Sequence, residues 1–126
     1  MLLVARAFQR QRAIPTRLQP HRPFPRLWRP PYGDVNGSLV SLARSLGLIT
    51  IQWSVDPRDW SLPGTGAIYS TVVNDARNGS IVLQHFGGGP RYETFAALPE
   101  EIATLRARGY RFVTVAQMLG LRLIYK

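Results

Sequence analysis

The sequence contains no cysteine, which excludes both disulfide bridges and thiolate metal sites. It also lacks a long apolar run, because none approaches the about 20 residues that a membrane-spanning helix requires. The opening stretch, MLLVARAFQRQR, has too few apolar residues before Arg6 to form the core of a signal peptide. From these absences we expect neither a membrane span nor an export signal in this sequence.

Acidic residues are absent until Asp34, and the net charge of +9 is concentrated before that point. Met1–Tyr32 carries seven arginines and six of the ten prolines, whereas residues 33–126 carry nine basic and seven acidic residues. A segment rich in Arg and Pro cannot bury enough apolar surface to fold by itself. We therefore expect residues 1–27 to be a poorly ordered basic segment and residues 28–126 to form one globular unit.

Helical and strand-like patterns alternate from Trp28 onward. The spacing of apolar residues predicts helices over 38–47, 67–77 and 96–108, each ended by a glycine, and a short helix over 115–121. Apolar runs predict buried strands over 48–53, 80–86 and 110–115. A weaker pattern predicts a short basic helix over 3–13. One face of the first long helix should be apolar, formed by Leu39, Leu42, Ala43 and Leu46.

Strands that alternate with helices form right-handed βαβ units and a parallel sheet, with reactive side chains in the loops after the strands. Asp56 follows the first predicted strand and His85 lies at the end of the second, so we expect these side chains to be neighbours. A carboxylate beside an imidazole favours the imidazolium form and fixes the tautomer, which suits a general acid. A structural ion pair of Asp56 or Asp59 with Arg58 is the alternative.

Three short segments lie at or near such loops: Arg29-Pro30-Pro31-Tyr32, Asp56-Pro57-Arg58-Asp59-Trp60 and Leu83-Gln84-His85. In this order and at these separations they resemble the third, fourth and fifth motifs of the polysaccharide deacetylases, the NodB-homology domain of carbohydrate esterase family four. The ending ARGYRFVTVAQML resembles that of the family too. The resemblance covers about residues 27–121. It implies an α/β fold, a partial (β/α) barrel of about the second half of the family's barrel, behind a basic Pro/Arg-rich N-terminal extension.

The resemblance implies roles for the matching residues of the last two motifs. His85 would be the general acid that protonates the leaving amine, and Asp56 would tune it. Leu83 and Trp60 would wall the apolar slot for the acetyl methyl group. The glycines after Phe86 are read as a flexible loop that frames the sugar groove.

The family reaction is the hydrolysis of N-acetyl groups on amino-sugar polymers, with a divalent metal (zinc or similar) that polarises the carbonyl. The first two family motifs, Thr-Phe-Asp-Asp-Gly and His-x-x-x-His, supply the base and the metal ligands. Neither occurs in this sequence, where His21 is the only histidine upstream of the matching motifs. Arg29 would hold the base aspartate that is lacking here, and the backbone N–H of Tyr32 would help to bind the oxyanion.

Three functions are therefore open. In the first, a deacetylase-like chain acts on an N-acetylated glycan only if a missing N-terminal half, another chain or self-association completes it. The acid-free start would suit a truncated or frameshifted gene product. In the second, a catalytically inactive remnant binds carbohydrate through Trp60, Tyr32 and Tyr92. In the third, a basic protein binds nucleic acid through residues 6–29, a reading that rests on charge alone. Family members usually act on cell-envelope or extracellular polymers.

Overall fold

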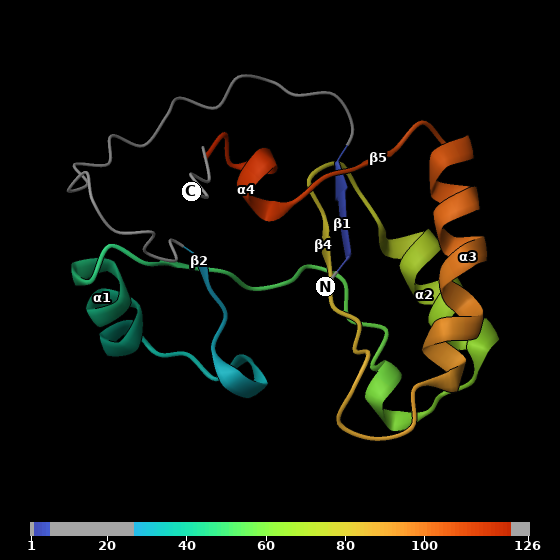
Figure 1. Cartoon of the computed structure of the whole chain (residues 1–126), viewed down its shortest axis with the longest axis horizontal. Helices are drawn as coiled ribbons and strands as arrows, with labels where there is room; N and C mark the ends of the chain where they lie inside the picture. The colour runs from blue at the N-terminus through green and yellow to red at the C-terminus, as the bar shows by residue number, and fades with distance from the viewer. Residues whose placement is uncertain (1, 6–26, 122–126) are drawn as a thin grey trace, which may run out of the picture.

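The structure, a computed structural model, describes residues 2–5 and 27–121 of the chain (Figure 1). The helices are η1 (Pro31–Gly33), α1 (Gly37–Ser45), η2 (Asp59–Ser61), α2 (Thr65–Asp75), α3 (Tyr92–Ala107) and α4 (Val115–Met118). The strands are β1 (Leu2–Ala5), β2 (Leu27–Trp28), β3 (Ile49–Thr50), β4 (Ile81–Val82) and β5 (Arg111–Phe112). Helices and strands alternate from β2 onward, as the sequence predicts.

The elements form two groups that meet at the strands. Helices α2 and α3 lie side by side along one edge of the molecule, and α1 lies at the opposite edge (Figure 1). The larger core cluster joins α2, α3 and the strands, and contains Val55, Val72, Val73, Ala76, Val82 and Leu105. A second, smaller cluster forms around Ile51 and Val115, with α4 packed on it. The larger core therefore lies directly beside the end of β4, which leads to His85.

The sheet is only partly parallel. Strands β2 and β3 are parallel, and Val55 forms an isolated parallel bridge with Val82. Strand β1 lies between β4 and β5 and is antiparallel to both, with Leu2 opposite Val82 and Val4 opposite Phe112. Strands β4 and β5 consequently run in the same direction, as a βαβ unit requires, but they are separated by β1.

The first residues show how long-range pairing overrides a weak local pattern. A helix was expected over 3–13, but residues 3–5 belong to β1 because its backbone pairs with β4 and β5. The rest of that segment lies outside the described residues. Residues 1–27 were expected to be poorly ordered, and this prediction concerns mostly positions 6–26, which lie outside the described residues. Leu27 already belongs to β2.

The observed helices lie close to their predicted positions. The Asn36 side chain accepts the backbone N–H of Leu39 at 2.8 Å, which begins α1 one residue before the predicted start. The long helix α3 begins at Tyr92 rather than at 96, and Pro99 lies inside it. Strands are shorter than predicted, because a residue counts as strand only where a neighbouring strand is available to pair with it.

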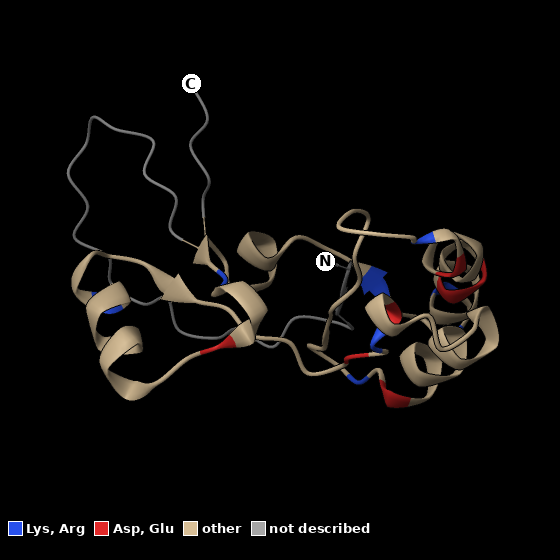
Figure 2. Ribbon diagram, turned by 90° about the horizontal axis from the view of Figure 1, so that it is seen from below, with Lys and Arg blue, Asp and Glu red and all other residues tan. Residues whose placement is uncertain are grey.

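The apolar face of α1 is largely uncovered. Ala43 is buried, but Leu42 and Leu46 are 57% and 56% exposed. The sequence predicted the amphipathic pattern, and the structure shows that much of this apolar face is exposed. Charged residues are sparse on this side of the molecule and are concentrated around α2 and α3 (Figure 2). Among the described residues, no element packs over the exposed leucines of α1.

Candidate active site

The site is centred on a contact between His85 and Asp59. His85 Nδ1 lies 2.6 Å from Asp59 Oδ1, and the backbone N–H of His85 donates to Asp59 Oδ2 at 2.7 Å. Thr94 Oγ1 donates to the same Oδ2 at 2.9 Å. The side chain of Asp59 is fully buried, whereas that of His85 remains 29% exposed. A buried carboxylate thus holds a histidine whose ring still reaches solvent.

Burial by itself would raise the pKa of Asp59, but the hydrogen bonds from His85 and Thr94 outweigh burial and lower the pKa below its ordinary value. Asp59 is therefore ionised at neutral pH. An ionised carboxylate can only accept hydrogen bonds, so His85 Nδ1 carries a proton. The other ring nitrogen, Nε2, is left to exchange a proton with a bound molecule.

The structure corrects the expected partner of His85. Asp56 was expected beside the imidazole, but its Oδ1 accepts the backbone N–H of Arg58 at 2.9 Å. Arg58 has a left-handed backbone (φ 50°) and is followed by the short turn of η2, which places Asp59 in the interior. A spacing argument cannot separate two aspartates three residues apart, because the local turn decides which one enters the core.

Two motif residues assigned to the acetyl slot differ in exposure: Leu83 is buried, and Trp60 is half exposed. The Arg58 guanidinium carbon lies 5.3 Å from the centroid of the Trp60 ring, a cation–π contact. The alternative of an ion pair between Arg58 and either aspartate is not seen, because the His85–Asp59 contact is the only salt bridge within the described residues.

Helix α3 supplies contacts that sequence analysis missed. Thr94 bonds Asp59, and Glu93 Oε2 accepts the backbone N–H of Gly64 at 2.7 Å. The buried guanidinium of Arg91 donates to the carbonyls of Gly87 at 3.2 Å and Gly88 at 3.1 Å, and also to that of Pro90. Arg91 therefore shapes the glycine loop after β4. The buried residues of α3 repeat at helical spacing and so lie on one face of the helix, a pattern that was present in the sequence. They are Thr94, Ala97, Glu101 and Leu105.

The Arg29–Tyr32 segment forms a separate tight turn. Tyr32 has a left-handed backbone (φ 57°) and a fully exposed side chain, and Arg29 is exposed as well. Gly33 packs against Trp53 so closely that an added Cβ would lie 2.3 Å from the indole ring. Gln52 Nε2 donates to the Gly33 carbonyl at 2.9 Å. These contacts tie the turn to the segment after β3 rather than to the His85–Asp59 pair.

Backbone strain coincides with the motif segments. Among the described residues, three other than glycine have positive φ: Tyr32, Arg58 and Leu62. Two lie inside the motifs and the third is two residues beyond Trp60. Such conformations cost about 1–3 kcal/mol each and gather at functional sites.

Comparison with known proteins identifies the family. No family model matches the chain. A curated peptidoglycan-N-acetylglucosamine deacetylase from Bacillus cereus is 45% identical over 97 residues, which are 75% of this chain and 46% of that protein. A crystal structure of a peptidoglycan N-acetylglucosamine deacetylase superposes with a TM-score of 0.74 at 32% identity, over 79% of this chain and 47% of the other. The chain belongs to the polysaccharide deacetylases of carbohydrate esterase family four.

This chain contains only part of a polysaccharide deacetylase domain. It spans about half the length of the relatives it matches, and its fold is a partial (β/α) barrel of the deacetylase type. A further similar structure is a pseudoenzyme of the same family from Bacillus anthracis, with a TM-score of 0.67 at 31% identity over 75% of this chain and 32% of the other. Family membership by itself therefore does not establish activity.

The family implies a divalent metal, and the described residues do not supply a site for one. No group of three or more His, Cys, Asp or Glu side chains gathers within residues 2–5 and 27–121. Arg29, which the family resemblance assigns to holding the catalytic base, contacts no carboxylate in that part of the deacetylase chain. No helix in the described ranges is long and apolar enough to cross a membrane.

Proposed function

We propose that His85 is the general acid of an N-deacetylation site and protonates the amine that leaves an N-acetylated amino sugar. The observation that supports this role is the paired contact of Asp59 with both the ring and the backbone of His85. Asp59 takes the supporting role that the sequence assigned to Asp56. Its negative charge stabilises the imidazolium form and fixes the Nδ1–H tautomer, so Nε2 faces the leaving group.

The remaining motif residues take roles consistent with their positions. Leu83, which is buried, and Trp60, which is half exposed, wall the slot for the acetyl methyl group. The backbone N–H of Tyr32, at the strained turn, contributes to oxyanion binding. Arg29 orients a carboxylate that comes from outside the described residues.

The base and the metal ligands, for zinc or a similar divalent ion, come from the part of the deacetylase domain that this chain does not span. The bound metal would polarise the acetamide carbonyl. The substrate class is a polymer of N-acetylated amino sugars, by analogy with the peptidoglycan deacetylase relatives. On this proposal, the chain supplies the acid side of a site that requires a second half.

The test is complementation in trans. The full chain is co-expressed with the part of the B. cereus relative that it does not match, and acetate release from an N-acetylglucosamine oligosaccharide is measured with and without added zinc. We expect zinc-dependent release that falls at least 100-fold in His85→Ala, because general acid catalysis contributes about 10²–10⁴-fold.

Two controls make the result decisive. The two halves of the B. cereus protein itself, co-expressed in the same way, must release acetate, which shows that a split domain can assemble. If they do so and this chain does not, or if His85→Ala keeps full activity, the proposed role of His85 is wrong. Zinc-dependent release by the purified chain alone would overturn the need for a second half.

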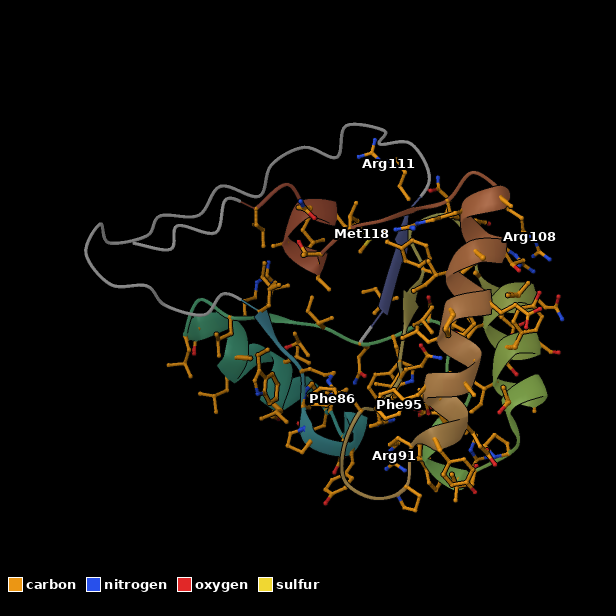
Figure 3. All side chains as sticks on the ribbon, turned by 45° about the vertical axis from the view of Figure 1, so that its right-hand side comes forward. Phe86, Arg91, Phe95, Arg108, Arg111 and Met118 are labelled. Atoms are coloured by element: carbon orange, nitrogen blue, oxygen red, sulfur yellow. The ribbon has the colours of Figure 1, made fainter. Side chains whose placement is uncertain are left out.

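A second candidate function is glycan binding without catalysis. Several large aromatic side chains near the site are exposed, and Figure 3 shows Phe86 and Phe95 around the loop after β4. Exposed aromatic rings offer faces on which sugar rings can stack. The exposed rings are Tyr32, Trp60, Phe86, Tyr92 and Phe95.

Binding is tested by titrating the full chain with N-acetylglucosamine oligosaccharides in an isothermal calorimeter. We expect Trp60→Ala to weaken binding, while Phe112→Leu, in β5 next to the C-terminal turn of α3, leaves it unchanged. Equal affinity of wild type and Trp60→Ala would contradict a role for this ring. The nucleic-acid alternative rests on residues 6–29, which lie almost entirely outside the described part of the chain.

A further inference from the structure

A second buried carboxyl group, that of Glu101, lies behind the strand end that carries His85. Its side chain is fully buried in α3. Gln84 Nε2 lies 3.0 Å from Glu101 Oε1 and 2.9 Å from Oε2. No basic side chain pairs with Glu101 in the described part of the chain. A buried, ionised carboxylate with a single neutral partner is strongly disfavoured.

The hydrogen bonding of Gln84 is incomplete in a way that points to a proton on Glu101. The amide oxygen of Gln84 is buried and accepts no hydrogen bond, while its nitrogen serves both carboxyl oxygens. A protonated Glu101 would donate its O–H to this otherwise unpaired Gln84 Oε1 and accept the Nε2–H with its other oxygen. Both groups would be satisfied by two reciprocal bonds.

The surrounding charges favour the same protonated form. Burial raises the pKa of Glu101, the hydrogen bond from Gln84 lowers it, and the negative charge of Asp59 raises it again, with a net increase. Asp59 is itself paired with His85. Along the contact with α2, the titratable groups have other partners: Tyr69 bonds Thr104, and Arg108 donates to the Val73 carbonyl.

One face of helix α3 thus contacts both the partner of His85 and the residue that precedes His85 in the chain. Thr94 bonds Asp59, the partner of His85, and two turns later Glu101 bonds Gln84, the residue before His85. We infer that Glu101 is a neutral carboxylic acid whose reciprocal pair with Gln84 positions His85, and that loss of its proton removes the bond to Gln84 Oε1 and so loosens this hold. The inference goes beyond the proposed function, because it concerns protonation and positioning whether or not the chain is catalytic.

The protonation state is tested directly by carbon-13 NMR of the full chain labelled at the glutamate carboxyl carbons. The chain has three glutamates, Glu93, Glu100 and Glu101, so the spectrum contains three carboxyl signals. The signal that disappears in Glu101→Gln should titrate above the ordinary glutamate value of 4.5. If it titrates at that ordinary value, Glu101 is an ionised carboxylate at neutral pH and the inference is wrong.

The positioning role is tested through the His85 ring. In a His21→Gln background His85 is the only histidine, and its nitrogen-15 shifts report on the hydrogen bond at Nδ1. We expect a second transition in these shifts at the pH where Glu101 titrates. Glu101→Gln, which can pair with Gln84 through two amide bonds but cannot ionise, should abolish that transition and keep the low-pH shifts.

The exposed neighbour provides a matched control, because Glu100→Gln removes a charge one residue away on the outside of α3. It should leave the second His85 transition unchanged. A transition that persists in Glu101→Gln, or its absence in the wild type, would overturn the positioning role. These measurements require no catalysis, so failure of the inference and failure of the proposed function are separate outcomes.

Discussion

Asp59 holds His85 twice, with Oδ1 at 2.6 Å from the ring Nδ1 and Oδ2 at 2.7 Å from the backbone nitrogen. One buried carboxylate therefore fixes both the orientation of the imidazole and the path of the chain that carries it. A contact to the ring alone would leave the end of β4 free to shift. This double contact explains why the second aspartate of the Asp-Pro-Arg-Asp-Trp segment matters structurally more than the first.

Asp59→Asn should destabilise the chain much more than Asp56→Asn. The asparagine amide would place a donor against the N–H groups of His85 or against Thr94, which leaves a buried polar group unsatisfied. We expect the free energy of unfolding, measured by urea denaturation at pH 7, to fall by about 2–3 kcal/mol. Asp56 is less buried and accepts a local backbone bond, so Asp56→Asn should cost no more than about 1 kcal/mol. Equal losses would contradict the pairing.

Acid should destabilise the protein through the same carboxylate. The pKa of Asp59 is lowered in the folded state, so its stabilising contribution is complete above the unfolded value near 3.8 and is lost as the pH falls through the folded pKa. We expect thermal midpoints measured from pH 5 to pH 2 to fall less steeply in Asp59→Asn than in the wild type. Parallel curves for the two proteins would show that Asp59 does not contribute.

Raising the pH should destabilise the protein through Glu101. Its folded-state pKa is raised, so its contribution is complete below the unfolded value near 4.5 and is lost as the pH rises through the folded pKa. Above that pH, Glu101→Gln should be more stable than the wild type, and Glu100→Gln should follow the wild-type curve. Urea midpoints between pH 5 and pH 9 measure the effect, and a wild-type curve that stays level across this range would refute it.

Thr94→Val removes the third hydrogen bond of Asp59 with little change in shape. Because Thr94 Oγ1 donates to a fully buried oxygen, we expect a loss of about 1–2 kcal/mol in the free energy of unfolding and a weaker depression of the Asp59 pKa. Thr71→Val, at a half-buried position of α2, is the control and should change stability by less than about 0.5 kcal/mol. Urea denaturation gives both values.

Gly33→Ala should disrupt the turn that follows Arg29. Gly33 has φ 71°, and a Cβ there would lie 2.3 Å from Trp53. Strain and overlap together should cost about 2–3 kcal/mol. Gly37→Ala in α1, where an added Cβ meets nothing within 4 Å, should leave stability unchanged or raise it by up to about 1 kcal/mol. If both variants lose the same stability in urea, the close packing of Gly33 on Trp53 is not what the turn requires.

Motifs and helix positions were readable from the sequence, because both depend on residues close together in the chain. The glycine stops and the apolar spacing placed the helices to within a few residues, and the three motif segments indicated the family. Strand lengths and the position of β1 were not readable, since pairing depends on which strands become neighbours. The exposed leucines of α1 show the same limit: an amphipathic pattern predicts a face but not what covers it.

The sequence by itself determined the family, the alternation of helices and strands, and the presence of a histidine at the end of a buried strand. Only the tertiary structure decided which aspartate meets that histidine. Asp56 and Asp59 are three residues apart, and the left-handed Arg58 followed by η2 sends one to a local turn and the other into the core. Tertiary packing also placed Thr94 and Glu101 behind the site, because the face that α3 presents to β4 is set by contacts distant in sequence.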